Sequence, residues 1–189
     1  MASVAILHEG NEKNTHDNEL LKLLVRELGL DENRIRFFGM KGKSNFFNED
    51  HDTYRLLRTG IENETIEKVL VIVDADYEKN DHSYGGYDNT LKGLKKTFTS
   101  LQFTSYCDIY IMCDPNTQAG YLESFLLSTI PSHQKACIET FLACSEFKSK
   151  ENHKAILNQI YNLAYPKAPF DFTHPHFDDL KTKLCNLFT

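Results

Sequence analysis

Long apolar runs, low-complexity tracts and a basic leader are all missing from this chain of 189 residues. No run of about 18 apolar residues occurs, and the opening "MASVAILHEG" has a short apolar stretch without a basic flank, so neither a membrane span nor a signal peptide is indicated. We therefore expect a cytoplasmic protein that does not contact a membrane. The length is near that of one ordinary α/β domain and allows one sizeable core.

Cysteine is sparse and shows no recognisable pattern. The number of cysteines is odd, and no C-x-x-C pair occurs, so neither a disulfide framework nor a zinc ribbon is indicated. We expect reduced thiols that are mostly buried. The five cysteines are Cys107, Cys113, Cys137, Cys144 and Cys185.

Positive charge is in short supply, with 21 Lys and Arg against 27 Asp and Glu and a net charge of −6. A broad surface for nucleic acid needs clustered Lys and Arg, because phosphate binding is driven by the release of counterions. Any contact with nucleic acid must therefore be local or carried by a metal ion. The sequence leaves open whether a partner ATPase supplies the grip on nucleic acid.

The pattern of apolar residues predicts the fold class. Short apolar segments predict strands at residues 3–7, 34–38, 68–73 and 108–112. Helical periodicity predicts intervening helices at residues 17–28, 52–63 and 87–101. This alternation is typical of a parallel sheet with helices on both faces and right-handed crossovers.

The remainder of the chain is predicted to be helical. Segments 121–129, 132–147 and 151–161 have helical patterns, and a Pro-rich, aromatic stretch precedes a last short helix. We therefore predict an α/β core with a mostly parallel four-stranded sheet in residues 1–130. Residues 131–189 form a helical C-terminal extension packed on the same domain.

Carboxylates stand where two of the predicted strands end. In "KVLVIVDADYEKND", five consecutive apolar residues stop at Asp74 and Asp76, and the first strand ends in "LHEG", which contains Glu9. Ligands of open parallel sheets bind beyond the carboxyl ends of the strands, and a spacing of two on extended backbone directs both aspartates to one side. Three converging carboxylates repel one another unless they share protons or hold a hard cation such as Mg²⁺ or Mn²⁺. The alternative is that D-x-D only caps the following loop.

These motifs resemble a known domain. The pair Glu9 and Gly10 after the first strand, with D-x-D after a later apolar strand, resembles the Toprim domain of primases, topoisomerases and OLD-type nucleases. The segment "DPNTQAGYLESFLL" is similar to an uncharacterised bacterial Toprim-like family related to the OLD nucleases, and the resemblance covers residues 4–130. It implies a Toprim-like, Rossmann-like fold.

The resemblance also implies roles for individual residues. Glu9 would act as acid or base in phosphoryl transfer, Asp74 and Asp76 would bind Mg²⁺, and Glu123 would be a further ligand. Related sequences often carry another acid where this chain has Lys13, which argues against a site for two metals, although Asp17 lies one helical turn further on.

Glu123 also has an ordinary explanation. A carboxylate in the first turn of a helix interacts favourably with the helix dipole. On the other hand, Leu122, Phe125 and Leu126 define a buried stripe with Glu123 beside it, and the preceding loop belongs to the same edge of the sheet as Glu9. Both roles stay open at this point.

The stretch "GMKGKSNFF" contains the last three residues of a P-loop signature, but Phe37 stands where that motif needs a glycine. In the Toprim-like interpretation, Lys41, Lys43 and the backbone N–H groups around Gly42 hold a phosphate near the metal, and Gly10 belongs to the same phosphate- or substrate-binding set. The alternative is a flexible glycine turn with solvated lysines.

Histidines give weaker signals. His8 precedes Glu9 on a strand and is therefore expected to face the opposite side, toward the core. His174 and His176 bracket Pro175, too close together to define a zinc site without further partners.

Two functions are consistent with these observations. One is a Mg²⁺-dependent phosphoryl-transfer enzyme that cleaves phosphodiesters of nucleic acid or a nucleotide, with Glu9 moving a proton. The other is a non-catalytic Toprim-like module that binds a metal-nucleotide or a protein partner.

Overall fold

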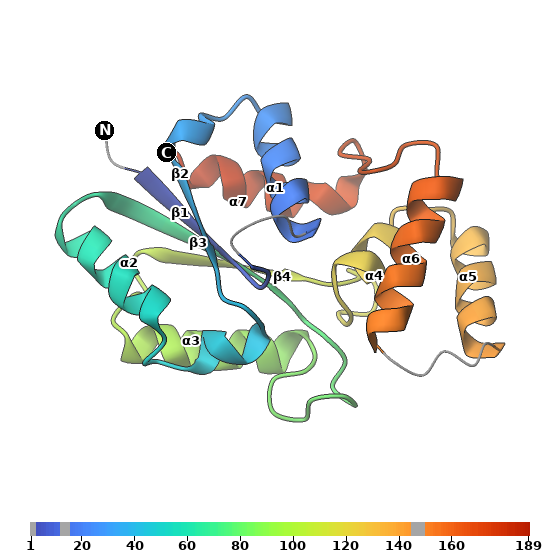
Figure 1. Ribbon diagram of the computed structural model, residues 1–189, viewed down its shortest axis with the longest axis horizontal. Coiled ribbons are helices and arrows are strands. Elements are labelled where there is room, and N and C mark those ends of the chain that lie inside the picture. The colour runs from blue at the N-terminus through green and yellow to red at the C-terminus, as the bar shows by residue number, and fades with distance from the viewer. Residues whose placement is uncertain (1–2, 12–15, 145–149) are drawn as a thin grey trace.

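The computed structural model describes residues 3–11, 16–144 and 150–189. Four strands, β1 (Ser3–His8), β2 (Ile35–Gly39), β3 (Ile66–Asp74) and β4 (Cys107–Met112), form one sheet in the order β2-β1-β3-β4. All neighbouring pairs are parallel. The fold is thus α/β with helices on the sheet, consistent with a Rossmann-like fold, and the predicted fold class is confirmed (Figure 1).

The register of the strands aligns their carboxyl ends. His8, the last residue of β1, lies opposite Ile72 of β3 and Gly39 of β2. At the far side of β3, Asp74 lies opposite Met112 of β4. Because β1 and β3 are direct neighbours, the residues that follow them emerge side by side at one edge.

Helices cover both faces of the sheet. Helices α1 (His16–Glu27) and α7 (Asp178–Asn186) lie on one face, and α2 (Asp52–Glu62) and α3 (Tyr87–Ser100) lie on the other (Figure 1). Successive strand residues point to alternate faces, so each buried strand supplies both cores. The α1 and α7 side receives Val4, Ile6, Leu70 and Ile72, and the α2 and α3 side receives Ala5, Leu7, Val69 and Val71. Burial of each large aliphatic side chain contributes about 1.5–3 kcal/mol.

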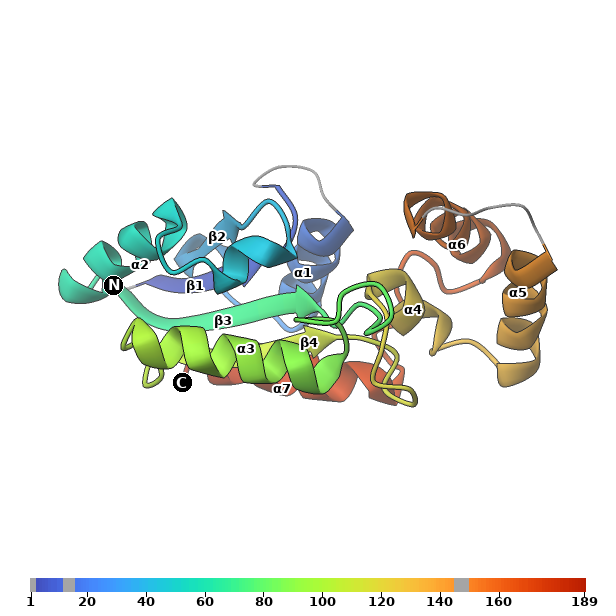
Figure 2. The same ribbon diagram turned by 90° about the horizontal axis from the view of Figure 1, so that it is seen from below.

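The C-terminal region has two locations. Helices α4 (Leu122–Leu127), α5 (Ser132–Cys144) and α6 (Lys150–Ala164) lie beyond the carboxyl ends of β3 and β4 (Figure 2). The chain then returns, and Leu180 and Leu184 of α7 are buried in the core cluster that contains Val4 of β1. The predicted extension therefore supplies part of the main core as well as a helical group beside the sheet edge.

Some predicted boundaries and burials need correction. The helix predicted at residues 121–129 is the shorter α4, and the predicted helix end at 145–147 lies outside the described residues. All five cysteines are free, but the prediction that they are mostly buried is wrong, because Cys137, Cys144 and Cys185 lie on exposed faces of α5 and α7. In the described part of the chain, no helix combines the length and the apolar character needed to cross a membrane.

Candidate functional site at the carboxyl edge of the sheet

Asp74 is the centre of a set of polar contacts. It is the last residue of β3 and is buried, and its backbone N–H donates to Oε2 of Glu9 at 3.4 Å. Its own Oδ1 accepts from the backbone N–H of Leu122, at the start of α4, at 3.2 Å. Its Oδ2 lies 3.1 Å from Nζ of Lys154 in α6. The carboxylate of Asp74 thus links α4 and α6 to the end of β3, and its backbone N–H links β3 to the residue that follows β1.

The backbone conformation of Asp76 differs from the predicted one. Its φ is 59°, so the backbone is left-handed and not extended, and the argument from a spacing of two fails at this residue. Aspartate adopts this conformation more readily than most residues. Two backbone hydrogen bonds with Gly120, of 2.6 and 2.9 Å, hold Asp76 in place. The buried carboxylate lies 3.6 Å from Nζ of Lys43.

The loop after the D-x-D pair has its own capping residue. The backbone N–H groups of Ser83 and Tyr84 donate to Oδ1 of Asp81, at 2.9 and 3.1 Å. Asp74 and Asp76 instead face lysines from other elements. Both aspartates therefore have contacts outside the loop that follows them, and their role in a metal site stays a prediction.

The glycine loop after β2 supports the carboxylates. Nζ of Lys43 is buried and donates to the carbonyl of Ala75 at 2.6 Å. Burial lowers the pKa of Lys43, whereas attraction to Asp76, Glu9 and Asp74 opposes that shift. This lysine therefore stabilises the D-x-D turn from inside the protein.

This arrangement corrects the predicted phosphate loop. The backbone N–H of Lys41 donates to the carbonyl of Gly10 at 3.3 Å, and that of Gly42 donates to the carbonyl of Glu9 at 2.9 Å. These N–H groups hold the β1 and β2 ends together and Lys43 is buried, so the two backbone donors and the Lys43 ammonium already have partners inside the protein. Lys41 is exposed, and its contact with a phosphate stays a prediction.

Lys154 is the residue of the site that the sequence did not reveal. It comes from α6, and its Nζ lies 4.4 Å from the centroid of the Tyr121 ring. Burial lowers its pKa, but the attraction of Asp74, Glu123 and Glu9 outweighs this effect and raises the pKa. All three carboxylates therefore act on one ammonium group.

Glu123 lies near the Lys154 ammonium because of how α4 packs, and the sequence predicted that packing. Leu122, Phe125 and Leu126 are buried in the main core, as predicted, which holds α4 against the sheet. Glu123 is half-buried beside them, and its charge acts on both Lys154 and Tyr121. Its place next to the site is consistent with the prediction, and its role as a metal ligand stays a prediction.

The donor set suits a hard cation, although the lysines stand against it. Glu9, Asp74, Asp76 and Glu123 provide only oxygen ligands, the type that Mg²⁺ and Mn²⁺ prefer. Across the described residues, no group of three or more His, Cys, Asp or Glu is arranged to hold a metal ion. Lys43 and Lys154 already neutralise part of the negative charge. Binding of Mg²⁺ or Mn²⁺ therefore requires rearrangement, most directly a movement of Lys154.

Lys13 and the side chain of Asp17, the two residues that bear on a second metal, lie outside the described residues.

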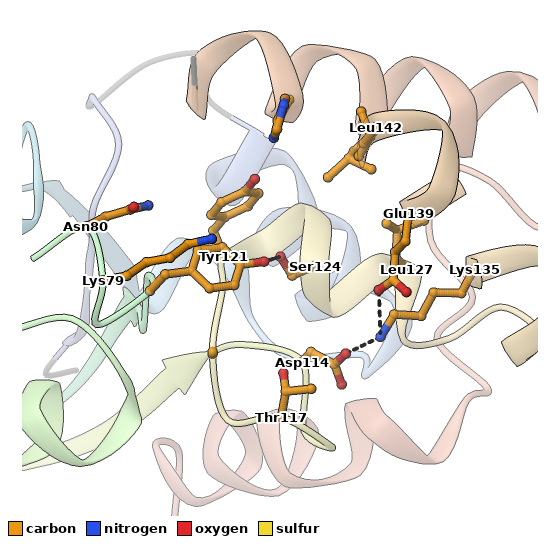
Figure 3. Close-up of a pocket in the computed structure, with 14 residues that line it drawn as sticks. Lys79, Asn80, Asp114, Thr117, Tyr121, Ser124, Leu127, Lys135, Glu139 and Leu142 are labelled. Atoms are coloured by element: carbon orange, nitrogen blue, oxygen red, sulfur yellow. Dashed lines mark hydrogen bonds and ion pairs between the residues drawn. The ribbon is translucent and has the colours of Figure 1, made fainter. Parts of the chain in front are cut away.

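A pocket of about 610 Å³ lies next to the carboxylates, between the loop after β3 and helices α4, α5 and α6 (Figure 3). Asp114, which follows β4, forms an ion pair with Lys135 of α5 across it. The hydroxyl groups of Tyr77 and Ser124 are 3.3 Å apart on its wall. The sequence did not predict this pocket, because its walls come from segments that only the fold brings together.

His8, His174 and His176 contact other groups inside the protein. His8 is fully buried on the α1 side of the sheet, packed edge-on to Phe37, as predicted. Burial, and then the charge of Lys22, lower its pKa to about 4. Nδ1 of His176 lies 2.8 Å from Oγ of Ser128, and Nδ1 of His174 accepts from the N–H of His176 at 3.2 Å.

The fold and site together define an α/β protein with an acidic cluster at the carboxyl edge of a parallel sheet. Comparisons with protein-family models, with curated proteins and with solved structures each find no match to this chain. The resemblance to Toprim proteins therefore rests on the sequence motifs.

Proposed function

We propose that this protein is a Mg²⁺- or Mn²⁺-dependent phosphoryl-transfer enzyme that cleaves phosphodiesters of nucleic acid or a nucleotide. The observation that carries the proposal is the charge at the sheet edge. The carboxylates of Glu9 and Asp74 act on both Lys43 and Lys154, that of Asp76 acts on Lys43, and that of Glu123 acts on Lys154. Carboxylates gathered in this way are the type of ligand that Mg²⁺ and Mn²⁺ prefer.

In this proposal, three carboxylates hold the cation and the two lysines have other roles. Asp74, Asp76 and Glu123 would hold the cation, which when bound polarises a phosphate oxygen and offsets its charge. Lys154 must leave Oδ2 of Asp74, which it contacts at 3.1 Å, and can then pair with the substrate phosphate. Lys43 keeps the turn that carries Asp76 in place through its bond to Ala75.

Glu9 is the residue for proton transfer. Its carboxylate is half-buried at the edge of the sheet, with Oε2 oriented by the backbone N–H of Asp74. In this position it can take a proton from an attacking water and return it to the leaving oxygen, a role typically worth about 10²- to 10⁴-fold in rate.

The acidic composition limits how nucleic acid is held. A net charge of −6 favours a local contact, through residues such as the exposed Lys41, over a broad basic surface. A partner protein such as an ATPase would then supply most of the grip on a long nucleic acid.

The test is cleavage of bis(p-nitrophenyl) phosphate, single-stranded DNA and single-stranded RNA with Mg²⁺, Mn²⁺ or EDTA. Glu9→Gln should lower the rate by about 100-fold or more, because the proton acceptor is lost while the shape is kept. Glu62→Gln is the matched control, since Glu62 is exposed at the end of α2, and it should keep the parent rate. Metal-dependent cleavage that survives in Glu9→Gln would remove Glu9 from the mechanism.

A non-catalytic module that binds a metal-nucleotide or a protein partner is the second candidate. It is favoured by the lysine partners of Asp74 and Asp76, since a partly neutralised site can bind a ligand without reacting with it. This candidate predicts equal affinity of the parent and Glu9→Gln for a Mg²⁺-nucleotide, with no turnover by either.

A further inference from the structure

The pocket beside α4 is joined to the carboxylates by a short series of contacts. The ring of Tyr121 forms part of its wall, and Nζ of Lys154 lies 4.4 Å from that ring. The same Nζ lies 3.1 Å from Oδ2 of Asp74. A ligand that fills the pocket and extends past Tyr121 therefore reaches the carboxylate edge.

The walls suit a flat group with apolar faces. The rings of Tyr77 and Tyr121 meet edge to face with centroids 5.8 Å apart. Leu127, Leu142 and Leu157 pack with them and supply apolar surface. Aromatic and aliphatic walls of this kind bind the faces of heterocyclic rings.

The polar groups of the pocket suit the edges of such a ring. Asn80, Thr117 and Ser124 offer neutral hydrogen-bonding groups around it (Figure 3). Lys135 is paired with Asp114 and lies 3.8 Å from Glu139, so its charge is balanced inside the protein. Lys79 also lines the pocket, with its Nζ 5.5 Å from the centroid of the Tyr77 ring. The pocket therefore combines neutral donors and acceptors, which suit the edges of a base, with a cation at its wall.

The geometry points to an unpaired nucleotide as the ligand, with its base in this pocket and its phosphate at the carboxylate edge. This inference rests on the proposed function and narrows the substrate to a mononucleotide or single-stranded nucleic acid. The volume of about 610 Å³ lies within the ordinary range for small-molecule sites. A base in a duplex is stacked and paired, so it cannot enter such a pocket without being extruded.

The test measures binding in Glu9→Gln, so that turnover does not interfere. Calorimetric titration with Mg²⁺ compares each of the four ribonucleoside 5′-monophosphates with ribose 5-phosphate, which lacks the base. We expect at least one nucleotide to bind about tenfold or more tightly than ribose 5-phosphate, because contact of the base with aromatic side chains adds to the affinity.

Pocket-filling variants locate the base. Leu142→Trp, on the inner face of α5, should remove the advantage of the nucleotide and leave the affinity for ribose 5-phosphate unchanged. Phe141→Trp is the matched control, because Phe141 precedes Leu142 in α5 but is 49% exposed on the outside of the helix. Thr117→Trp fills the pocket from an exposed loop and tests the same point if Leu142→Trp fails to fold.

The outcomes separate this inference from the proposed function. Three results would overturn the base pocket: equal affinity for nucleotides and ribose 5-phosphate, no nucleotide binding at all, or an undiminished nucleotide preference in a folded pocket-filling variant. Cleavage by the parent would still support the proposed enzyme in each case. A nucleotide preference that is lost in the filled variants, with no cleavage by the parent, would support the pocket and refute the enzyme.

Discussion

Buried His8 makes the stability of this protein depend on pH. The side chain is fully buried in β1, and neither ring nitrogen has a hydrogen-bond partner among the described residues. Burial and the charge of Lys22 lower its pKa from 6.5 to about 4. The folded protein therefore keeps His8 neutral in a pH range where the unfolded chain binds a proton. This contribution to stability is complete above about pH 6.5 and is lost as the pH falls toward 4.

The size of the effect follows from proton linkage. With pKa values of 6.5 unfolded and about 4 folded, lowering the pH from about 7.5 to about 5 costs about 2 kcal/mol of unfolding free energy. The total unfolding free energy of a single domain is about 5–15 kcal/mol, so this loss is a substantial fraction of the stability. His176 shifts in the same direction, because burial and His174 also lower its pKa. The contribution of His8 must therefore be read as a difference between variants.

The assay is urea unfolding of the parent and of His8→Leu near pH 7.5 and pH 5. His8→Leu removes the titrating group, so its loss of stability between the two pH values should be smaller than the parent's by about 2 kcal/mol. His133→Leu, at an exposed position in the first turn of α5, is the control and should show the parent's pH dependence. The reasoning is refuted if His8→Leu and the parent lose the same free energy.

Three further predictions concern the site. Lys154→Met should lower the stability of the metal-free protein by about 1–3 kcal/mol and raise its affinity for Mg²⁺, because the carboxylate of Asp74 loses its cationic partner. Melting curves with and without Mg²⁺ measure both effects, and Lys183→Met, which removes a surface ion pair, is the control. Asp76→Asn should abolish Mg²⁺ stabilisation and still fold, since Asn tolerates the left-handed backbone; unchanged Mg²⁺ affinity would make this aspartate purely structural. Glu123→Gln should weaken Mg²⁺ or Mn²⁺ binding in calorimetry by about 10- to 100-fold, and an affinity equal to that of Glu62→Gln would reduce Glu123 to a partner of the helix dipole.

The sequence by itself determined the elements and the edge where polar residues gather. Strands buried on both faces read as continuous apolar runs, and helices repeat their apolar residues with a different period, so both patterns are local. Parallel strands joined by helices align their carboxyl ends, which brought Glu9 and Asp74 together without knowledge of any contact. The same alternation also predicted that His8 faces the core.

Only the tertiary structure decided which cations meet these carboxylates and what lies beside them. Asp74 and Lys154 are 80 positions apart, and nothing in the local pattern of α6 distinguishes this lysine from a solvated one. Asp76 adopts a left-handed conformation because its backbone pairs with Gly120, and no local sequence pattern predicts this pairing. The pocket likewise depends on how α5 and α6 pack beyond the sheet. Local periodicity fixes the direction of a side chain within its own element, whereas the partner that it meets is fixed by packing between elements distant in the chain.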